Sequence, residues 1–455
     1  MIGDRIFMNK KGKIKGKRNY TTIILVSFLL VILVGAGLLC LPFATAEGFT
    51  TSFHTALFTA TSATCVTGLI VVDTATHWTV FGKIVIILLI QIGGLGIMTI
   101  ISLIAIFLAK NSSLSSRTLA MQAAGAVSYQ EVKRTLKTIF IGTGSFEFLG
   151  ACVLSIRFIP RFGVLKGVAY SFFHSVSAFC NAGFDIFGTE NGASLTQFSN
   201  DPLVLITIAL LIIFGGIGFI VWGDTARHGV HVKRYSFHSK IALTTTFVLL
   251  VFGTASLLVT EMNASFSDMD WGEKILNAFF QSTTLRTAGF AAVDQASLSS
   301  AGTVISYFLM FIGGTAGSTA GGLKTTTFAV LVLTVVTILR RRNEIVVFKR
   351  KISEKSIKSA CSIAFVYLAA IIASTVLICA VDRMSATDVA FETVSAIGTV
   401  GLTKGITPQL GLVSEYVIIV LMFAGRLGGM SFMLAFSTAK SKQVTERPSE
   451  NVIIG

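Results

Sequence analysis

Four short segments share a pattern whose residue types suit the coordination of a dehydrated cation. Each begins with Phe, carries Ser or Thr four residues later and has Gly ten residues after the Phe. They are 58–69 (FTATSATCVTGL), 173–184 (FHSVSAFCNAGF), 279–290 (FFQSTTLRTAGF) and 391–402 (FETVSAIGTVGL). The four glycines recur at nearly equal intervals along the chain, which indicates an internal repeat.

Backbone carbonyls are the chemistry that this pattern offers. A cation that sheds its water needs a ring of oxygen atoms in exchange, and extended main chain can supply that ring. Gly tolerates the backbone angles of such a turn, and the side chains before each Gly differ between copies, which favours main-chain ligands. The alternative is four tight turns at helix ends. The predicted cation ligands are the carbonyls of Val66, Thr67, Gly68, Asn181, Ala182, Gly183, Thr287, Ala288, Gly289, Thr399, Val400 and Gly401. We call the four segments the filter segments and their glycines the filter glycines.

The elements that must position these segments are long apolar runs. The chain is 53% hydrophobic and 13% charged, whereas soluble domains carry roughly 25% charged residues. Eight runs approach or exceed the ~20 residues that cross a bilayer core. They are 22–41, 84–109, 138–156, 202–223, 241–260, 302–323, 359–381 and 416–439, of which the third holds Glu147 and the last Arg426.

Each repeat therefore consists of a span (M1), a short half-helix (P), a Gly-centred loop and a second span (M2). A re-entrant loop is tolerated at membrane depth only where it lines a cavity or is buried in protein. We predict an all-α membrane protein with eight transmembrane helices plus four re-entrant pore half-helices, as four fused M1–P–M2 repeats with pseudo-fourfold symmetry around one pore. The predicted boundaries are a basic segment 1–20, repeats 21–110, 111–224, 225–342 and 343–439, and a tail 440–455.

The net charge of +15 is distributed in a way that argues against nucleic-acid binding. With eight spans and an inner N-terminus, 27 of the 37 Lys and Arg residues lie in inner segments and eight in outer ones. The positive-inside rule explains this bias, and a contact with lipid or a partner is the alternative. We expect a multi-pass plasma-membrane protein with both termini cytoplasmic, surrounded by membrane lipid.

The remaining motifs exclude other site chemistry. The six Cys form no CxxC pair, the six His form no metal set, and no nucleophile–base pair stands out, so we expect no enzyme and no organic cofactor. Asp73 and Asp294 each follow a filter-type Gly by five residues, which favours an acidic mouth that concentrates cations; ordinary solvated loop acids are the alternative.

Glycine also recurs in the second span of each repeat. Gly93-Gly94, Gly215-Gly216, Gly313-Gly314 and Gly425-Arg426 follow the four filter-type glycines at a similar depth, which is typical of close helix packing. In the third repeat, five glycines within 313–322 (GGTAGSTAGG) predict an interrupted helix. No Gly-Lys-[ST] triplet occurs there, so a nucleotide-binding loop is not expected.

These motifs together resemble the Trk/Ktr/HKT superfamily of potassium transporters. TSATCVTGL, SAFCNAGF, LRTAGF and SAIGTVGLT, with GGTAGSTAGGLKTTTF and GRLGG, are most similar to the membrane subunit of bacterial Ktr systems, over about 22–439. The resemblance implies K+ uptake, a homodimer with one pore per protomer, and a cytosolic octameric ring of nucleotide-binding regulatory subunits. It makes Na+ a candidate activator. Gly at all four filter positions implies K+ preference, and the absence of TVGYG implies looser selectivity than in simple K+ channels.

The same resemblance gives roles to the charged and glycine-rich segments inside the membrane. The intramembrane gating loop would comprise Gly313, Gly314, Thr315, Ala316, Gly317, Ser318, Thr319, Ala320, Gly321, Gly322 and Lys324. Arg426 would constrict the pore beside that loop, or else pair with Glu147 or a helix carbonyl. We expect Glu147 to be a structural partner, and Arg286 to brace the third loop through carbonyls or to pair with Glu392.

Three other functions fit the same sequence. The first is a K+–Na+ or K+–H+ symporter on the same fold. The second is the K+-binding subunit of a P-type pump, and the third is an intramembrane enzyme or receptor.

Overall fold

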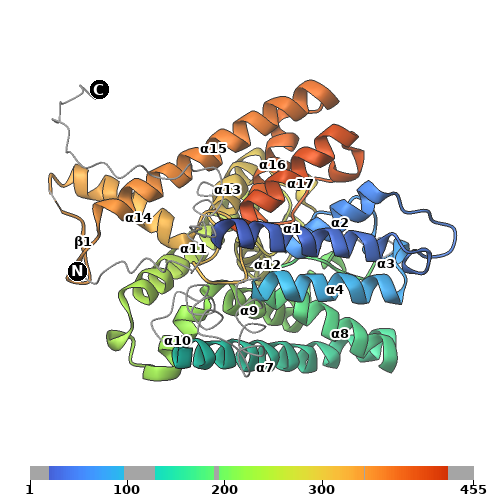
Figure 1. Cartoon of the computed structure of the whole chain (residues 1–455), viewed down its shortest axis with the longest axis horizontal. Helices are drawn as coiled ribbons and strands as arrows, with labels where there is room; N and C mark the ends of the chain where they lie inside the picture. Colours follow the sequence, from blue (N-terminus) through green and yellow to red (C-terminus); the bar gives the residue numbers. More distant parts are fainter. Residues whose placement is uncertain (1–19, 97–128, 189–193, 343, 429–455) are drawn as a thin grey trace, which may run out of the picture.

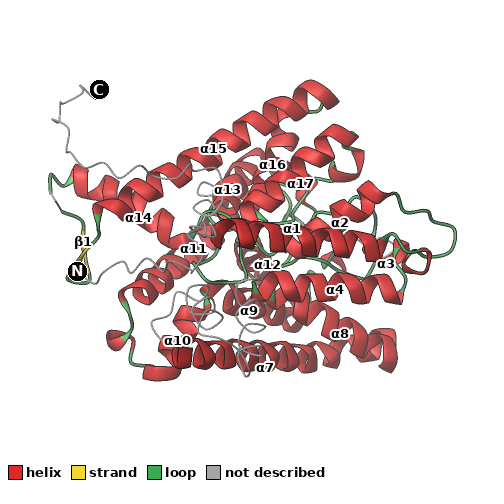
Figure 2. Ribbon diagram, viewed as in Figure 1, coloured by secondary structure: helices red, strands yellow, loops and turns green. Residues whose placement is uncertain are grey.

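The computed structural model describes residues 20–96, 129–188, 194–342 and 344–428, and most of them are helical (Figure 1 and Figure 2). The first and second groups of helices are α1 (Tyr20–Leu39), α2 (Phe53–Cys65), α3 (Thr74–His77) and α4 (Val80–Leu95), then α7 (Tyr129–Phe162), α8 (Val164–Phe179), α9 (Pro202–Ile217) and α10 (Phe219–His228). The third and fourth are α11 (Phe237–Glu261), α12 (Trp271–Thr284), α13 (Ser300–Phe311) and α14 (Thr325–Leu339), then α15 (Glu354–Asp382), α16 (Ala386–Gly398) and α17 (Leu412–Leu427). Single 3-10 turns are η1 (Pro42–Ala44), η3 (Thr196–Phe198), η4 (Val232–Arg234), η5 (Gln295–Ser297) and η6 (Thr407–Gln409).

Polar side chains fix where many of these helices begin. The hydroxyl of Ser52 accepts from the backbone N–H of Thr55 at 3.3 Å, and that of Ser299 accepts from Gly302 at 3.0 Å. Asp270 and Glu273 form a reciprocal capping box at the start of α12. Such caps satisfy backbone donors that the first helical turn leaves without partners. The helices α2, α12 and α13 therefore start at defined residues.

The short helices α2, α8, α12 and α16 pack in a cyclic order. Each contacts the first long helix of its own group: α1, α7, α11 and α15 respectively. Each also contacts the later helix of the preceding group, so that α8 lies against α4, α12 against α9, α16 against α13, and α2 against α17. The fourth group thus closes onto the first. Buried side chains follow this closure, since one core cluster joins Phe58 of α2 to Ile397 of α16 and Ile418 of α17.

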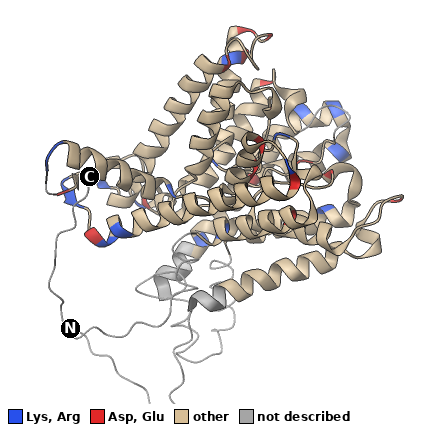
Figure 3. Ribbon diagram, turned by 90° about the horizontal axis from the view of Figure 1, so that it is seen from above, with Lys and Arg blue, Asp and Glu red and all other residues tan. Residues whose placement is uncertain are grey.

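Several helices have the length and composition of membrane spans. Within the described residues, α7, α11 and α15 are each long and apolar enough to cross a bilayer, and α9 together with α10 forms a fourth candidate if the pair is counted as one. The helices α4, α13 and α14 are apolar but shorter. In Figure 3 the ribbon is coloured for charged residues mainly near helix ends and in loops, and the long middle sections of the helices carry few of them.

The structure departs from the expected continuous span over 202–223. The chain bends by 92° between α9 and α10, at Gly218, whose φ is +99°. Glycine adopts this angle without the steric cost that a Cβ brings. The break is filled by another segment, because Phe219 N donates to Gly317 O at 2.8 Å.

A small hairpin also departs from the all-α expectation. Strands β1 (Val346–Val347) and β2 (Arg350–Lys351) pair antiparallel, with Val346 opposite Lys351. Phe348 and Lys349 form the turn with positive φ. The pairing is local and lies between α14 and α15, far from the filter segments in the chain.

Candidate functional site

The four filter segments adopt one backbone conformation. The first residue of each predicted triplet has a left-handed φ: 57° at Val66, 59° at Asn181, 69° at Thr287 and 50° at Thr399. The Gly two residues later again has positive φ, between 68° at Gly183 and 95° at Gly68. The glycines were expected to need such angles. The left-handed Val and Thr residues were not, because non-Gly residues rarely adopt them without support from their surroundings.

The four glycines meet in a closed cycle. A Cβ added to Gly68 would lie 2.5 Å from Ala182 O, one added to Gly183 would lie 2.7 Å from Ala288 O, and one added to Gly289 would lie 2.5 Å from Val400 O. Gly401 returns to the first segment, because its Cβ would fall still closer to Thr67 O. Each glycine thus touches the carbonyl that precedes the glycine of the next segment. The structure brings all four predicted triplets together around one centre, and their non-glycine side chains are buried.

Hydrogen bonds at the helix ends hold three segments in the same way. Thr67 N donates to Ser62 O, Ala182 N to Ser177 O and Val400 N to Ser395 O, each at 2.8 Å. The third segment differs from the expected alignment on Thr283. There Ala288 N donates to Thr284 O at 2.9 Å, and the Thr284 hydroxyl donates to Phe290 O at 2.7 Å. The turn that contains Arg286 is therefore closed one residue later than its three counterparts.

The ends of the short helices create a negative potential at this centre. α2, α8, α12 and α16 all run toward the filter segments and end beside them. Carbonyls at a helix C-terminus carry a net partial negative charge of about half an electron. No Asp or Glu occurs within the four triplets. The arrangement can therefore hold a cation through main-chain oxygen and helix ends alone.

Glycines of the later helices allow these ends to pack closely. A Cβ on Gly93, Gly215 or Gly425 would collide with the carbonyl of Thr64, Phe179 or Ile397, in that order. Each of these carbonyls belongs to the residue four before a filter glycine. Side chains at these positions would push α4, α9 and α17 away from the filter segments.

Residues 312–324 form a loop that lies directly against the filter segments. Gly313 N donates to Leu323 O at 2.8 Å, so the two ends of the loop are tied together. Thr315 N donates to Gly216 O at 3.0 Å, and the Thr319 hydroxyl donates to Asn181 Oδ1 at 3.2 Å. A Cβ on Gly321 would collide with the Thr399 side chain. The loop therefore contacts filter residues of the second and fourth segments and the break between α9 and α10.

Two cations border this loop. The Arg426 guanidinium donates to Thr319 O in the loop and to Gly93 O and Gly94 O at the end of α4, the last at 3.3 Å. Lys324 Nζ donates to Ala320 O at 2.8 Å. Arg426 is thus a bridge from the loop to the first group of helices. Its predicted alternative pairing with helix carbonyls is present, and pairing with Glu147 is not.

Glu147 has partners that were not considered from the sequence, and Arg286 has neither of the partners expected for it. Gln91 Nε2 donates to Glu147 Oε2 at 3.3 Å, and the Cys180 thiol lies 3.9 Å from Oε1, so Glu147 links α7 to α4 and α8. Arg286 neither braces a carbonyl nor pairs with Glu392 within the described part of the chain. Glu392 instead accepts from the Thr407 hydroxyl. That expectation for Arg286 was wrong because the side chain is turned toward a small internal cavity.

The acids after the filter glycines have local structural partners. Asp73 caps α3 by accepting from Ala75 N at 3.2 Å, and Asp294 caps η5 by accepting from Ala296 N at 3.0 Å. Asp185, which the sequence reasoning missed, follows Gly183 by two residues. Burial raises the pKa of Asp185 to about 6, although a hydrogen bond from Phe187 N opposes the rise; the Asp73 carboxylate adds to it.

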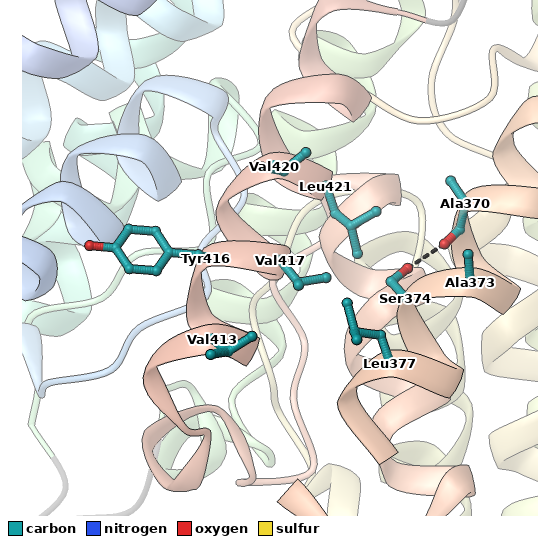
Figure 4. Close-up of a pocket in the computed structure, with 9 residues that line it drawn as sticks. All are labelled: Ala370, Ala373, Ser374, Leu377, Val413, Tyr416, Val417, Val420 and Leu421. Atoms are coloured by element: carbon teal, nitrogen blue, oxygen red, sulfur yellow. Dashed lines mark hydrogen bonds between the residues drawn. The ribbon is translucent and has the colours of Figure 1, made fainter. Parts of the chain in front are cut away.

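The apolar groove between α15 and α17 has a different character (Figure 4). Ala370, Ala373 and Leu377 face Val413 and Val420 across it. The Ser374 hydroxyl is directed back to Ala370 O in its own helix, as Figure 4 shows. The groove offers a cation no ligands and is separate from the filter segments.

Comparisons with known proteins identify the family and several relatives of this chain. The family model TrkH, described as a cation transport protein, matches residues 6–447. "Potassium/sodium uptake protein NtpJ" of Enterococcus hirae is 38% identical over 98% of this chain and 99% of its own length. "Ktr system potassium uptake protein B" is 38% identical in Bacillus subtilis, over 95% and 96%, and 39% identical in Vibrio alginolyticus, over 98% and 97%.

A solved structure shares the fold. The potassium transporter TrkH from Vibrio parahaemolyticus superposes with a TM-score of 0.73 at 20% identity, covering 94% of this chain and 87% of its own. The family model and the relatives confirm the resemblance read from the sequence, and with it the prediction that the chain is no enzyme. With a family match across nearly its whole length, this multi-pass membrane protein belongs to the TrkH family of cation transport proteins.

Proposed function

We propose that this chain takes up K+ across the plasma membrane through the centre of its four filter segments. The observation that carries the proposal is the closed cycle in which each filter glycine touches the carbonyl before the next one. A ring of inward carbonyls replaces the hydration shell of a cation. The twelve residues named as cation ligands are proposed in that role, with K+ as the transported ion and no organic cofactor.

The four groups of helices are proposed to be four M1–P–M2 repeats around one pore, with the boundaries given from the sequence. Eight spans, four half-helices and pseudo-fourfold symmetry are supported by the cyclic packing of α2, α8, α12 and α16. Both termini are proposed to be cytoplasmic on the basis of the Lys and Arg bias. The inside-negative potential supplies ~2.3 kcal/mol per charge per 100 mV for uptake.

Loop 312–324, with Lys324 and Arg426, is proposed to be the gate. The support is its contact with Asn181 and Thr399 on the side where Arg426 bridges Thr319 to Gly93 and Gly94. A guanidinium at this depth opposes the passage of K+ by like-charge repulsion. In this conformation the loop and Arg426 close the path.

The relatives support proposals about partners and coupling. Two of them are named as protein B of a Ktr system, which supports a second, regulatory component as a partner. That this partner is a cytosolic octameric nucleotide-binding ring, and that the chain forms a homodimer, is proposed from the resemblance. Another is named a potassium/sodium uptake protein, which favours Na+ as an activator or a K+–Na+ symporter as the second candidate function. Reversal potentials measured against Na+ and pH gradients separate a uniport from either symporter.

Flux into liposomes tests the main proposal. Purified protein in liposomes with an inside-negative potential should take up K+ or Rb+, and far less Na+. Removal of residues 315–320 should raise that flux, since it removes the contacts to Asn181 and Gly216. Absence of K+ flux in both the intact protein and the deletion variant, each shown to be folded by a cooperative thermal transition, would refute the proposal.

A further inference from the structure

A small internal cavity lies behind the second filter segment, walled by Asn181, Gly216, Thr246, Arg286 and Gly314. These residues come from the filter, from α9, from α11, from the end of α12 and from loop 312–324. The centre of a water-sized sphere can occupy about 10 Å³ of this cavity. That is room for a single small guest, such as one water molecule or one monatomic ion.

Three polar groups that border this cavity have no hydrogen-bond partner among the described residues. They are Arg286 Nε, Asn181 Nδ2 and Thr246 Oγ1. The side chains are buried, with exposed fractions of 7%, 1% and 6%. Thr254 of the same helix returns its hydroxyl to Leu250 O at 2.7 Å, whereas the Thr246 hydroxyl makes no such bond. Each such buried group costs free energy unless something in the cavity satisfies it.

Arg286 also lacks a charged partner. Among the described residues it forms no ion pair, and no other charged group there interacts with it appreciably. A buried guanidinium at membrane depth is costly without a counter-charge.

We infer that this cavity is a binding site for a small monovalent anion, with chloride as its physiological occupant. Two of its polar groups can only donate hydrogen bonds, and the Thr246 hydroxyl can donate a third. An anion accepts all three and neutralises Arg286. A water molecule would leave that charge in place.

The site is joined to the filter and to the loop by direct contacts. Asn181 carries a filter carbonyl, and its Oδ1 accepts from Thr319. Gly314 forms a wall of the cavity, and the next residue, Thr315, donates through its N–H to Gly216 O. Withdrawal of the loop would remove that wall. A bound halide therefore stabilises the conformation described here, and the effect on transport, which rests on the proposed gate, is lower K+ flux in chloride than in gluconate.

Binding is tested on the purified full-length protein without any transport assay. The thermal midpoint is measured in bromide, chloride and gluconate at constant ionic strength and constant K+, and crystals grown in bromide are examined for anomalous density. We expect halide to raise the midpoint in a saturable way, with a bromide peak beside Arg286. Equal midpoints in halide and gluconate, or a cavity without bromide, would show that water fills it and would overturn the inference.

Variants separate this site from other anion effects. Thr246→Val keeps the shape of the side chain and removes one donor, so the half-saturating halide concentration should rise about tenfold, as for loss of a hydrogen bond to an ion. Arg286→Met should abolish the halide effect. Thr254→Val on the same helix is the matched control, because its hydroxyl bonds only its own helix, and it should behave as wild type. Halide stabilisation unchanged in Thr246→Val would place the ion elsewhere and refute the assignment, even if K+ transport were intact.

Discussion

Alanine substitution at each filter glycine tests the closed cycle most directly. The change adds one methyl group, and the structure says what that methyl meets. At Gly68 and Gly289 the new Cβ would lie 2.5 Å from a main-chain oxygen, at Gly183 it would lie 2.7 Å away, and at Gly401 it would be closest. Real Cβ atoms essentially never approach within 3.0 Å of another heavy atom. The carbonyl of the next segment must therefore move in every variant, and it must move further in the Gly68 and Gly289 variants than in the Gly183 variant.

The displaced atom is a proposed K+ ligand of the next segment, which sets the expected size of the effect. Positive φ at a non-Gly residue adds a cost of about 1–3 kcal/mol. If about 1.4 kcal/mol of this is lost from the preference for K+, the K+/Na+ permeability ratio falls about tenfold. The loss should be largest for Gly401→Ala, intermediate and similar for Gly68→Ala and Gly289→Ala, and smallest for Gly183→Ala.

The assay is the reversal potential, or paired Rb+ and Na+ fluxes, of purified variants in liposomes. Gly37→Ala is the matched control, because Gly37 lies in α1 and a Cβ there meets no atom within 4 Å. It should leave the permeability ratio unchanged. Unchanged ratios in all four filter variants, with normal folding, would refute the filter assignment; a rank order unrelated to the distances would refute the cyclic contact geometry.

The remaining predictions concern the gate and the mouth. Arg426→Gln removes the charge that bridges Thr319 to Gly93, so K+ flux should rise at least tenfold; an unchanged flux would contradict the gate. Thr319→Val loses a single hydrogen bond to Asn181 and should raise flux only about three- to fivefold, with Thr334→Val, whose hydroxyl bonds Val330 O in α14, as the control. Uptake from dilute K+ should fall as the external pH drops below about 6, because Asp185 then becomes neutral and the negative potential at the mouth weakens. Asp185→Asn should have low uptake at every pH with no step near 6, and a retained step would assign it to another group.

Much of the candidate site could be predicted from the repeat, because the chemistry belongs to the main chain. Glycine at four matched positions signals the backbone conformation directly. The left-handed Val66 and Thr399 could not be foreseen, since their intrinsic preferences are against it and hydrogen bonds back to α2 and α16 impose it. Packing around the turn decides the backbone conformation of these residues, and their own residue type does not.

A repeated glycine in the sequence indicates the bend at Gly218, although the hydropathy pattern does not. Gly96, Gly218 and Gly428 each lie three residues after Gly93, Gly215 and Gly425, and each has a φ between +78° and +99° at the end of a helix. An apolar run of sufficient length looks like one span whether or not it is straight. The partner that fills the break, loop 312–324, comes much later in the chain, and no local property of 202–223 specifies it.

The side-chain partners of the buried charges were the least predictable part. Glu147 and Gln91 are separated by 56 residues, and Arg426 reaches a carbonyl 333 residues away. The sequence indicates that a buried charge needs a partner, but it does not say which of many carbonyls will be near. For Arg286 this reasoning failed because none of the described residues is the partner.

Fusing the four groups into one polypeptide has a consequence for how such a path can be closed. Loop 312–324 belongs to the third group, and it reaches filter residues of the second and fourth. In an assembly of four identical subunits, every subunit would place the same loop at the same axis, and the four loops would clash sterically. Four groups joined in one chain escape that restriction, since one group can carry a loop that lies against the centre while the other three do not.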